Sequence, residues 1–462
     1  MSQTINKSRL FNASCFALIT TAFSFSIRAG ILPQLATDFN LSGEQLGFIN
    51  SMWFLGFPIA MIVGGLVYHT FGPKNIMMVA FVCHALGIIL TLYPGLLGGY
   101  TGLLVSTFLI GIGNGCTEAA CNPMIADSYQ GAEMSTKLNR FHMWFPGGIV
   151  LGSLLSKFMT DANLGWQAQI WLILIPTLIY AYLFWGQTFP TSQNADSMKV
   201  NKSFKSAIPF FVIAAIFTLV TYISGLLGIQ NFLTNNAQIY YYIGIASCLI
   251  GVYLSFGPLY SFIFACMAIT AITEFGPQQW TGLIMSKSGA SPMLILALVT
   301  GLMAVIRYFA GPIVAKFDQT GVLLGSAIFA TIGIYLLSTQ TGSMVYVAAV
   351  FFAMGVALFW PNMIGFIAEK VPLSGALGMS IVGGVGMFST SIFQPIIGRW
   401  IDNSKAEQTA AGLTGDAMEL AAGQSTLSTM VIFPLILVVA FAGLYVYMRK
   451  RPAMATTEYK VS

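Results

Sequence analysis

The chain has 462 residues, of which 56% are hydrophobic and only 8% are charged. Soluble domains carry about 25% charged residues, so this composition excludes an ordinary water-soluble protein and indicates a polytopic membrane protein. The net charge of +5 is spread over single Lys and Arg residues rather than a basic stripe, which argues against a nucleic-acid partner.

A membrane helix needs about 20 mostly apolar residues. By this measure the N-terminal half of the chain predicts six spans, at residues 10–35, 46–68, 76–97, 102–126, 138–159 and 167–189. The apolar stretch 11–27 is followed by no small-residue cleavage site, so we expect the first span to remain in the mature protein. The polar stretch 190–206 then predicts a surface linker.

The second half of the chain predicts eight further spans. They lie at residues 207–227, 238–256, 259–285, 292–314, 322–337, 344–368, 376–400 and 427–447. The first two predict an inserted helix pair that fills space beside the bundle; the alternative is a misread long connection. The fold class is therefore all-α and polytopic, with about fourteen spans. We expect the chain to divide into a six-helix bundle (1–189), a cytoplasmic linker (190–206), the inserted pair (207–258), a second six-helix bundle (259–450) and a cytoplasmic tail (451–462).

The distribution of Lys and Arg predicts the orientation of these spans. Of the 20 Lys and Arg residues, Arg28 and Arg307 lie well inside predicted spans. With a cytoplasmic N-terminus only Lys157, Lys287, Arg399 and Lys405 lie outside, and the other 14 face the cytoplasm. Cytoplasmic loops carry the excess of positive charge, so we expect both termini in the cytoplasm and a multi-pass protein of a bacterial inner membrane.

Two stretches, one in each half of the chain, share a sequence pattern. Gly65-Leu-Val-Tyr-His-Thr-Phe-Gly-Pro-Lys74 and Arg307-Tyr-Phe-Ala-Gly-Pro-Ile-Val-Ala-Lys316 both place glycine in the last turns before a lysine. This repeat resembles the loop signature that the major facilitator superfamily carries after the second helix of each half, although His69 stands where that family has aspartate. The resemblance implies two six-helix bundles and a gating or structural role for Gly65, Gly72, Lys74, Arg307 and Gly311, which leaves Arg307 outside the predicted substrate site.

Ionisable side chains inside a bilayer are costly and mark functional sites. Glu118 and Asn122 are four residues apart, so they share one face of the fourth predicted span. A carboxyl group in a low-dielectric setting can take up and release a proton near neutral pH, so Glu118 is a candidate for proton coupling. The alternative is that Arg28 or a helix dipole neutralises Glu118.

The stretch around Glu118 carries a second resemblance. Glu-Ala-Ala-Cys-Asn-Pro at 118–123, followed by Lys-Leu-Asn-Arg-Phe-His at 137–142, is similar to the fucose permease branch of the superfamily, the fucose, galactose and proton symporters. The resemblance implies that Glu118 serves sugar and proton and that Asn122 and Asn139 bind substrate. His142 replaces a glutamine of that branch; it is either a proton relay or a hydrogen-bonded histidine at a helix end.

Arg28 is a fixed positive charge well inside the first span. It could hold the carboxylate or phosphate of a substrate in a bidentate geometry. It could also pair with Glu118 or Glu274 and leave the substrate neutral. The sequence favours pairing, because an arginine without a counter-charge is costly in a membrane.

In the second half, Thr-Glu-Phe-Gly-Pro-Gln-Gln-Trp at 273–280 places Gly276 and Pro277 among polar residues. It predicts a broken helix that exposes polar groups to a ligand; the alternative is a proline kink with Trp280 at the membrane interface. Glu274 is a second candidate for proton coupling, and aromatic and amide side chains suit a sugar. The predicted substrate-binding residues of this half are Gln278, Trp280, Asn362 and Gln394.

No motif for catalysis, nucleotide binding or metal binding is present, and the six cysteines lack Cys-x-x-Cys spacing. We therefore expect no enzymatic activity, no cofactor and no metal. The sequence favours proton-coupled uptake of a monosaccharide or related sugar by a monomer in the bilayer. The alternatives are a carrier of organic anions or sugar acids that uses Arg28, or a non-transporting membrane enzyme or sensor.

Overall fold

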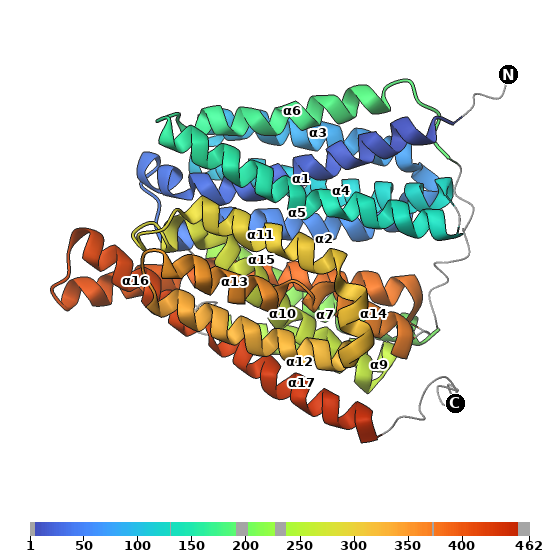
Figure 1. The fold of residues 1–462 in the computed structure, drawn as a ribbon. Helices are drawn as coiled ribbons and strands as arrows, with labels where there is room; N and C mark the ends of the chain where they lie inside the picture. The colour runs from blue at the N-terminus through green and yellow to red at the C-terminus, as the bar shows by residue number, and fades with distance from the viewer. Residues whose placement is uncertain (1–4, 130, 191–201, 227–236, 372–373, 451–462) are drawn as a thin grey trace.

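The computed structural model describes residues 5–129, 131–190, 202–226, 237–371 and 374–450, and within these ranges it contains helices and no strand (Figure 1). Most of the predicted linker 190–206 and the whole tail 451–462 lie outside the described residues. Eleven helices are long and apolar enough to cross a membrane, and shorter apolar helices cover residues 242–256 and 292–308. The all-α polytopic fold class is thus confirmed.

The first six helices pack together, and we call them the N-bundle. They are α1 (Lys7–Asp38), α2 (Gly43–Phe71), α3 (Pro73–Leu92), α4 (Tyr100–Ser128), α5 (Gly131–Asp161) and α6 (Trp166–Phe184), with a 3₁₀ turn at Pro94–Leu97. Ser42 and Gln45 form a capping box that starts α2. Gly72 ends it at φ +80°, a conformation that glycine adopts without strain, and Pro73 then opens α3.

The last helices form a second group, the C-bundle, which lies below the N-bundle in Figure 1. Its members are α10 (Pro258–Ile284), α11 (Pro292–Tyr308), α12 (Ala310–Thr339), α13 (Met344–Val356), α14 (Phe359–Lys370), α15 (Gly375–Ala410), α16 (Gly415–Met430) and α17 (Ile432–Lys450). The predicted spans 344–368 and 427–447 are each made by two successive helices, and α12 is kinked at Asp318, which has φ +54°.

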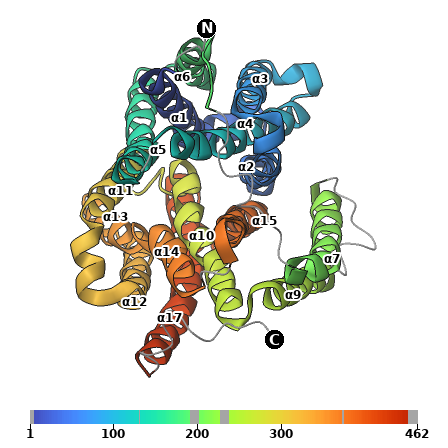
Figure 2. The ribbon, with the colours of Figure 1, turned by 90° about the vertical axis from the view of Figure 1, so that its right-hand side faces the viewer.

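Between the bundles in sequence lie α7 (Lys202–Leu226) and α9 (Ala237–Phe256), which pack against each other. Figure 2 shows this hairpin outside both bundles, on the side of α2, α10 and α15. Many of its apolar side chains are exposed, as expected of a surface that faces lipid. The predicted inserted pair is therefore a helical hairpin, and the alternative of a misread connection is wrong for the described residues.

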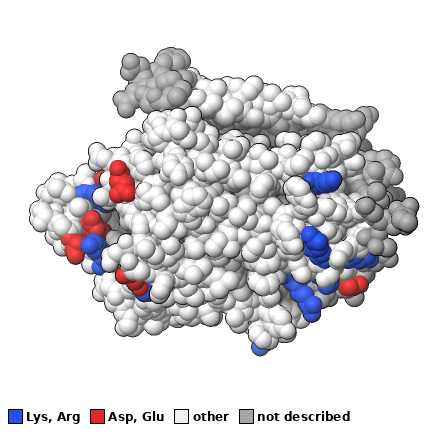
Figure 3. Space-filling view, turned by 90° about the horizontal axis from the view of Figure 1, so that it is seen from above, with Lys and Arg blue, Asp and Glu red and all other residues white. Residues whose placement is uncertain are grey.

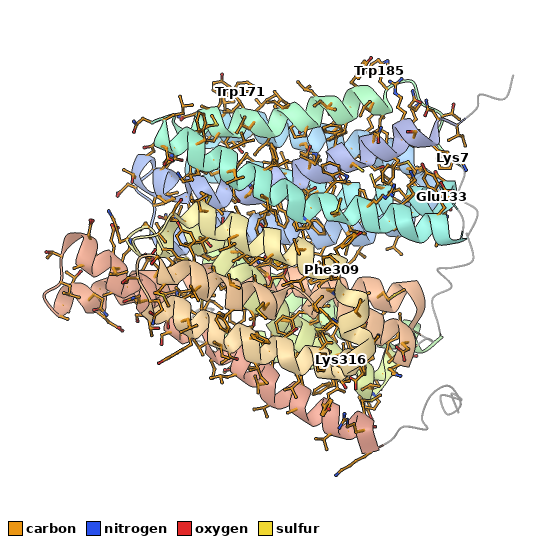
Figure 4. All side chains as sticks on the ribbon, viewed as in Figure 1. Lys7, Glu133, Trp171, Trp185, Phe309 and Lys316 are labelled. Atoms are coloured by element: carbon orange, nitrogen blue, oxygen red, sulfur yellow. The ribbon has the colours of Figure 1, made fainter. Side chains whose placement is uncertain are left out.

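On the face shown in Figure 3, charged side chains gather at the two ends of the molecule and leave a broad uncharged belt between them. We name the ends by α1, which begins at the Lys7 end and finishes at the Asp38 end. Lys7, Glu133 and Lys316 lie toward the Lys7 end, whereas Trp171 and Trp185 lie along the outer side of α6 (Figure 4). Because α17 finishes at Lys450 on the Lys7 end, the described chain starts and stops on the same side of the belt (Figure 1).

Candidate functional site

The two bundles meet along α2 and α15, α5 and α11, and α1 and α10. We call the first of these contacts the α2–α15 seam. It is narrow because small residues face each other: a Cβ atom added to Gly47 would lie 2.5 Å from the carbonyl oxygen of Gln394, and Gly43 contacts Gly398. Backbones can approach this closely only where side chains are absent.

Polar contacts join α2 to α15 at the Asp38 end of the seam. The Asp402 carboxylate on α15 accepts hydrogen bonds from the backbone N–H groups of Gly43 (2.7 Å) and Glu44 (2.9 Å), so the C-bundle caps the first turn of α2. Arg399 pairs with the Glu44 carboxylate at 2.5 Å. Two further contacts between the bundles, Ser51 with the Ser391 carbonyl and Gln279 Nε2 with the Phe25 carbonyl, lie between this end and mid-depth. The structure is thus closed at that end.

Aromatic side chains from both bundles meet at mid-depth. This central aromatic cluster comprises Phe25, Trp53, Phe54, Phe57, Phe145, Phe275 and Trp360. The ring of Phe275 lies 5.9 Å from that of Phe25 and 5.7 Å from that of Phe54, so the cluster crosses the boundary between the bundles. Sequence reasoning gave the residues of this cluster no role, because a phenylalanine in an apolar helix looks the same whether it packs in a core or at a site.

A buried hydrogen-bonded chain holds Trp53 of this cluster. The Trp53 indole N–H donates to Ser24 Oγ (2.9 Å), and the Asn114 amide also donates to Ser24 (3.1 Å). Asn114 Oδ1 lies 2.9 Å from Nε2 of His84, whose Nδ1 lies 2.9 Å from the Tyr180 hydroxyl. The chain joins five helices of the N-bundle and fixes the orientation of Trp53. Sequence reasoning did not single out this network.

Arg28 lies one helical turn from Phe25, toward the Asp38 end, and is only 5% exposed. Its Nη1 donates to Thr107 Oγ1 at 2.6 Å, and its Nε–H has no hydrogen-bond partner among the described residues. The favoured pairing of Arg28 with Glu118 or Glu274 is wrong. Thr107 is eleven residues from Glu118, about 16 Å along α4, and Glu274 has another partner.

Glu118 and Asn122 do lie together. The Asn122 amide donates to Glu118 Oε2 at 2.5 Å, and Asn122 Oδ1 has no partner among the described residues. Both side chains are partly exposed, although Glu118 lies about 15 Å from the end of α4 at Ser128. Glu118 is therefore not fully enclosed by the protein, whereas the sequence reasoning placed its carboxyl group in a low-dielectric setting.

The predicted break in α10 is wrong. This helix runs without interruption through Gly276 and Pro277, and the break occurs instead between α13 and α14, at residues 357–358. Pro361 explains it, because a proline has no N–H to donate to the carbonyl four residues earlier, which here belongs to Ala357. Arg307 Nε donates to this Ala357 carbonyl at 2.8 Å.

Arg307, which the sequence reasoning left outside the substrate site, pairs with an acid. Its Nη2 lies 3.6 Å from Glu274 Oε1, and the second Glu274 oxygen has no partner among the described residues. The Glu274 side chain is 3% exposed, whereas that of Arg307 is 29% exposed. The C-bundle thus holds a buried carboxylate whose counter-charge comes from the end of α11, the position that the loop repeat had marked as structural.

The other predicted residues of the C-bundle are buried. Trp280 is fully buried, so the alternative that placed it at the membrane interface is wrong, and its indole N–H has no partner among the described residues. Gln278 Nε2 contacts the Met303 sulfur at 3.7 Å, and the Asn362 amide donates to the Leu358 carbonyl at the break. Gln394 lies at the α2–α15 seam, where neither amide atom finds a described partner, and the same holds for Asn50 of α2.

The two remaining predicted residues lie on α5. Asn139 belongs to this helix, but its side chain is outside the described part of the chain. His142 is exposed, with its ring 5.0 Å from that of Phe141. Because α5 begins at Gly131, His142 lies in the body of the helix, and the alternative of a helix-end histidine is wrong. Among the residues of the loop repeat, Gly65 and Gly311 have open space where a Cβ atom would lie. At Gly72 the backbone has a positive φ, which favours glycine over other residues.

The chain is similar to known membrane transporters over part of its length. The family model of the Major Facilitator Superfamily matches residues 14–392. The hexuronate transporter of Bacillus subtilis is 27% identical over 38% of this chain and 42% of its own length. The L-fucose-proton symporter of Escherichia coli is 25% identical over 34% of this chain and 36% of its own length. The chain thus matches less than half the length of these relatives.

The fold is also similar to solved structures. An auto-inhibited peptide transporter of the POT family superimposes with a TM-score of 0.73 over 98% of this chain and 99% of its own, at 14% sequence identity. At that identity the similarity concerns the fold alone.

Proposed function

The chain belongs to the Major Facilitator Superfamily, and we propose that it is a secondary transporter that takes up a small carboxylated sugar together with protons. In this proposal the bundles 1–189 and 259–450 rock about the central aromatic cluster, so that substrate reaches the site from one side of the membrane at a time. The substrate is moved and not chemically changed. We propose that the protein acts as a monomer in a bacterial inner membrane.

The environment of Arg28 is the main support for a carboxylated substrate. A buried guanidinium without an acid is costly, and this one retains an Nε–H that no described residue accepts. A carboxylate would supply both the missing charge and the missing acceptors, because it matches the fork of guanidinium donors. The similarity to a hexuronate transporter supports the same class of substrate.

A neutral monosaccharide is the second candidate. The central aromatic cluster offers ring faces for the C–H surface of a sugar, and the indole N–H of Trp280 is a free donor among the described residues. The similarity to a fucose symporter supports this candidate. The two candidates differ in one chemical requirement, because only a sugar acid needs the charge of Arg28.

Proton coupling is proposed for Glu118. Its partial exposure permits exchange of protons with water, and Asn122 stabilises the carboxylate by one hydrogen bond. Glu274 is the second candidate, but its counter-ion Arg307 already holds it, and the exposed His142 is the third. We also propose that the Lys7 end is cytoplasmic, so that the described state is closed toward the outside.

Uptake into proteoliposomes with an imposed proton gradient tests the proposal. D-Glucuronate serves as the acidic probe and L-fucose as the neutral one. We expect Arg28→Gln to reduce glucuronate uptake at least 100-fold, because the charge that holds the carboxylate is lost. Arg140→Gln, which removes an exposed cation from α5, is the matched control and should leave uptake unchanged. Equal loss of both substrates in Arg28→Gln, or uptake of fucose alone by the parent protein, contradicts the carboxylated substrate.

A further inference from the structure

The α7–α9 hairpin joins both bundles, although it lies outside them. It continues into the C-bundle through a single connecting residue, Gly257, and the ring of Phe256 lies 4.4 Å from that of Tyr260 on α10. Tyr260 in turn donates to the Gly378 carbonyl of α15 at 2.6 Å. The hairpin is thus attached firmly to the C-bundle by its second helix.

The first helix of the hairpin contacts the N-bundle near its Asp38 end. Tyr222 of α7 is 6% exposed, and its ring packs edge-on against Phe48 of α2 at 5.5 Å. The Tyr222 hydroxyl donates to Ser51 Oγ at 2.6 Å. Phe48 and Ser51 lie one helical turn apart, so together they form the place on α2 where the hairpin rests.

Ser51 is also the point at which α2 crosses α15. Its hydroxyl donates to the Ser391 carbonyl at 2.5 Å, and the Ser391 hydroxyl donates back to the Ser51 carbonyl at 3.1 Å. The Ser391 carbonyl lacks a donor within its own helix, because the residue four positions later is Pro395. Each hydroxyl donates one proton, which gives a continuous chain from Tyr222 through Ser51 to Ser391.

This arrangement depends on the relative position of the bundles. If α2 moves away from α15 at the Asp38 end, the hairpin stays with α10, and the contact of Tyr222 with Ser51 must break. A contact that exists in one state only shifts the equilibrium toward that state. We propose that the α7–α9 hairpin is a latch that stabilises the state closed at the Asp38 end, with the Tyr222 hydroxyl as its fastening group. This inference goes beyond the proposed function, needs no knowledge of the substrate, and replaces the prediction that the hairpin only fills space.

Pulsed electron paramagnetic resonance tests the latch in lipid nanodiscs without substrate. Spin labels are attached at Thr37→Cys of the N-bundle and Asn403→Cys of the C-bundle, two exposed positions at the Asp38 end, after replacement of the six native cysteines by alanine. We expect Tyr222→Phe to raise the ratio of long to short label distances about fivefold, as for the loss of one buried hydrogen bond. The ring and its packing on Phe48 are retained.

Tyr253→Phe is the matched control, because it removes a hydroxyl from α9 on a side chain that is 55% exposed. It should leave the distance distribution unchanged. In a Ser51→Ala background the Tyr222→Phe change should have no further effect, since its acceptor is gone. Identical distributions for Tyr222→Phe and the parent overturn the latch, and so does an equal shift caused by Tyr253→Phe. None of these outcomes depends on which substrate is carried or on whether Glu118 couples to protons.

Discussion

At the scale of single residues, Glu118 and Asn122 are a contact that spacing alone predicts, because residues four apart on a helix meet whatever surrounds them. The partner of Arg28 could not be predicted in this way. It depends on how α1 is rotated against α4, which turns the guanidinium toward Thr107 and away from every acid among the described side chains. Long-range pairs such as Arg307 and Glu274 escape sequence reasoning for the same reason.

Glu118→Gln tests the coupling role at this scale. Glutamine keeps the size of the side chain and resembles the protonated carboxyl, so we expect substrate binding and the exchange of labelled for unlabelled substrate to continue. Accumulation against a gradient should fall to the level set by equilibration, because no proton is carried. Both quantities are measured in proteoliposomes.

The matched control for this prediction is Glu133→Gln, which removes an exposed acid from the start of α5 and should accumulate substrate normally. If Glu118→Gln still concentrates substrate in response to a proton gradient, another group couples transport. Glu274 then becomes the first residue to replace.

At the scale of elements, each predicted span overlaps a helix, but several bounds differ: α5 begins at Gly131 instead of residue 138, α12 begins at Ala310 instead of residue 322, and α15 continues to Ala410 instead of residue 400. Apolar length is a local property, so a sequence window can measure it. The interruption at 357–358 depends on a third helix. Pro361 leaves the Ala357 carbonyl without its usual backbone donor, and Arg307 of α11 donates a hydrogen bond to that carbonyl instead. Pro277 leaves a carbonyl free as well, but α10 continues there. A proline thus indicates an available carbonyl, and the neighbours decide whether the helix opens.

Two glycines of α2 give a prediction about the packing of elements. In Gly47→Ala the new methyl group meets the Gln394 carbonyl and the Pro395 Cα, both at 2.5 Å, so α2 must move away from α15. We expect a loss of about 1–3 kcal/mol in stability, seen as a melting temperature lower by several degrees in detergent.

Gly65→Ala is the matched control in the same helix. Nothing lies within 4 Å of the added atom, so the melting temperature should stay the same or rise slightly. A large loss for Gly65→Ala would mean that the loop repeat needs this glycine for a contact absent from the described state. An unchanged Gly47→Ala protein would show that the seam is looser than its backbone distances indicate.

At the scale of the whole molecule, the distribution of charge predicts the orientation in the membrane. The Lys7 end carries most of the Lys and Arg residues, so we expect it to face the cytoplasm. In a background without native cysteines, Glu407→Cys at the Asp38 end should react with an impermeant maleimide in intact cells. Lys74→Cys, exposed at the other end, should react only after permeabilisation. Reaction of Lys74→Cys in intact cells would reverse the orientation.

The amides of Asn50 and Gln394 have a consequence for the balance between states. In the closed state no described residue satisfies these buried groups, which costs about 1–3 kcal/mol for each. Separation of α2 from α15 would let water reach both, so the open state is the more hydrated one. Solutes that are excluded from protein surfaces oppose such hydration and favour the closed state. If the bundles alternate as proposed, we expect the equilibrium between the two states to shift with water activity, which osmotic stress on the cell changes.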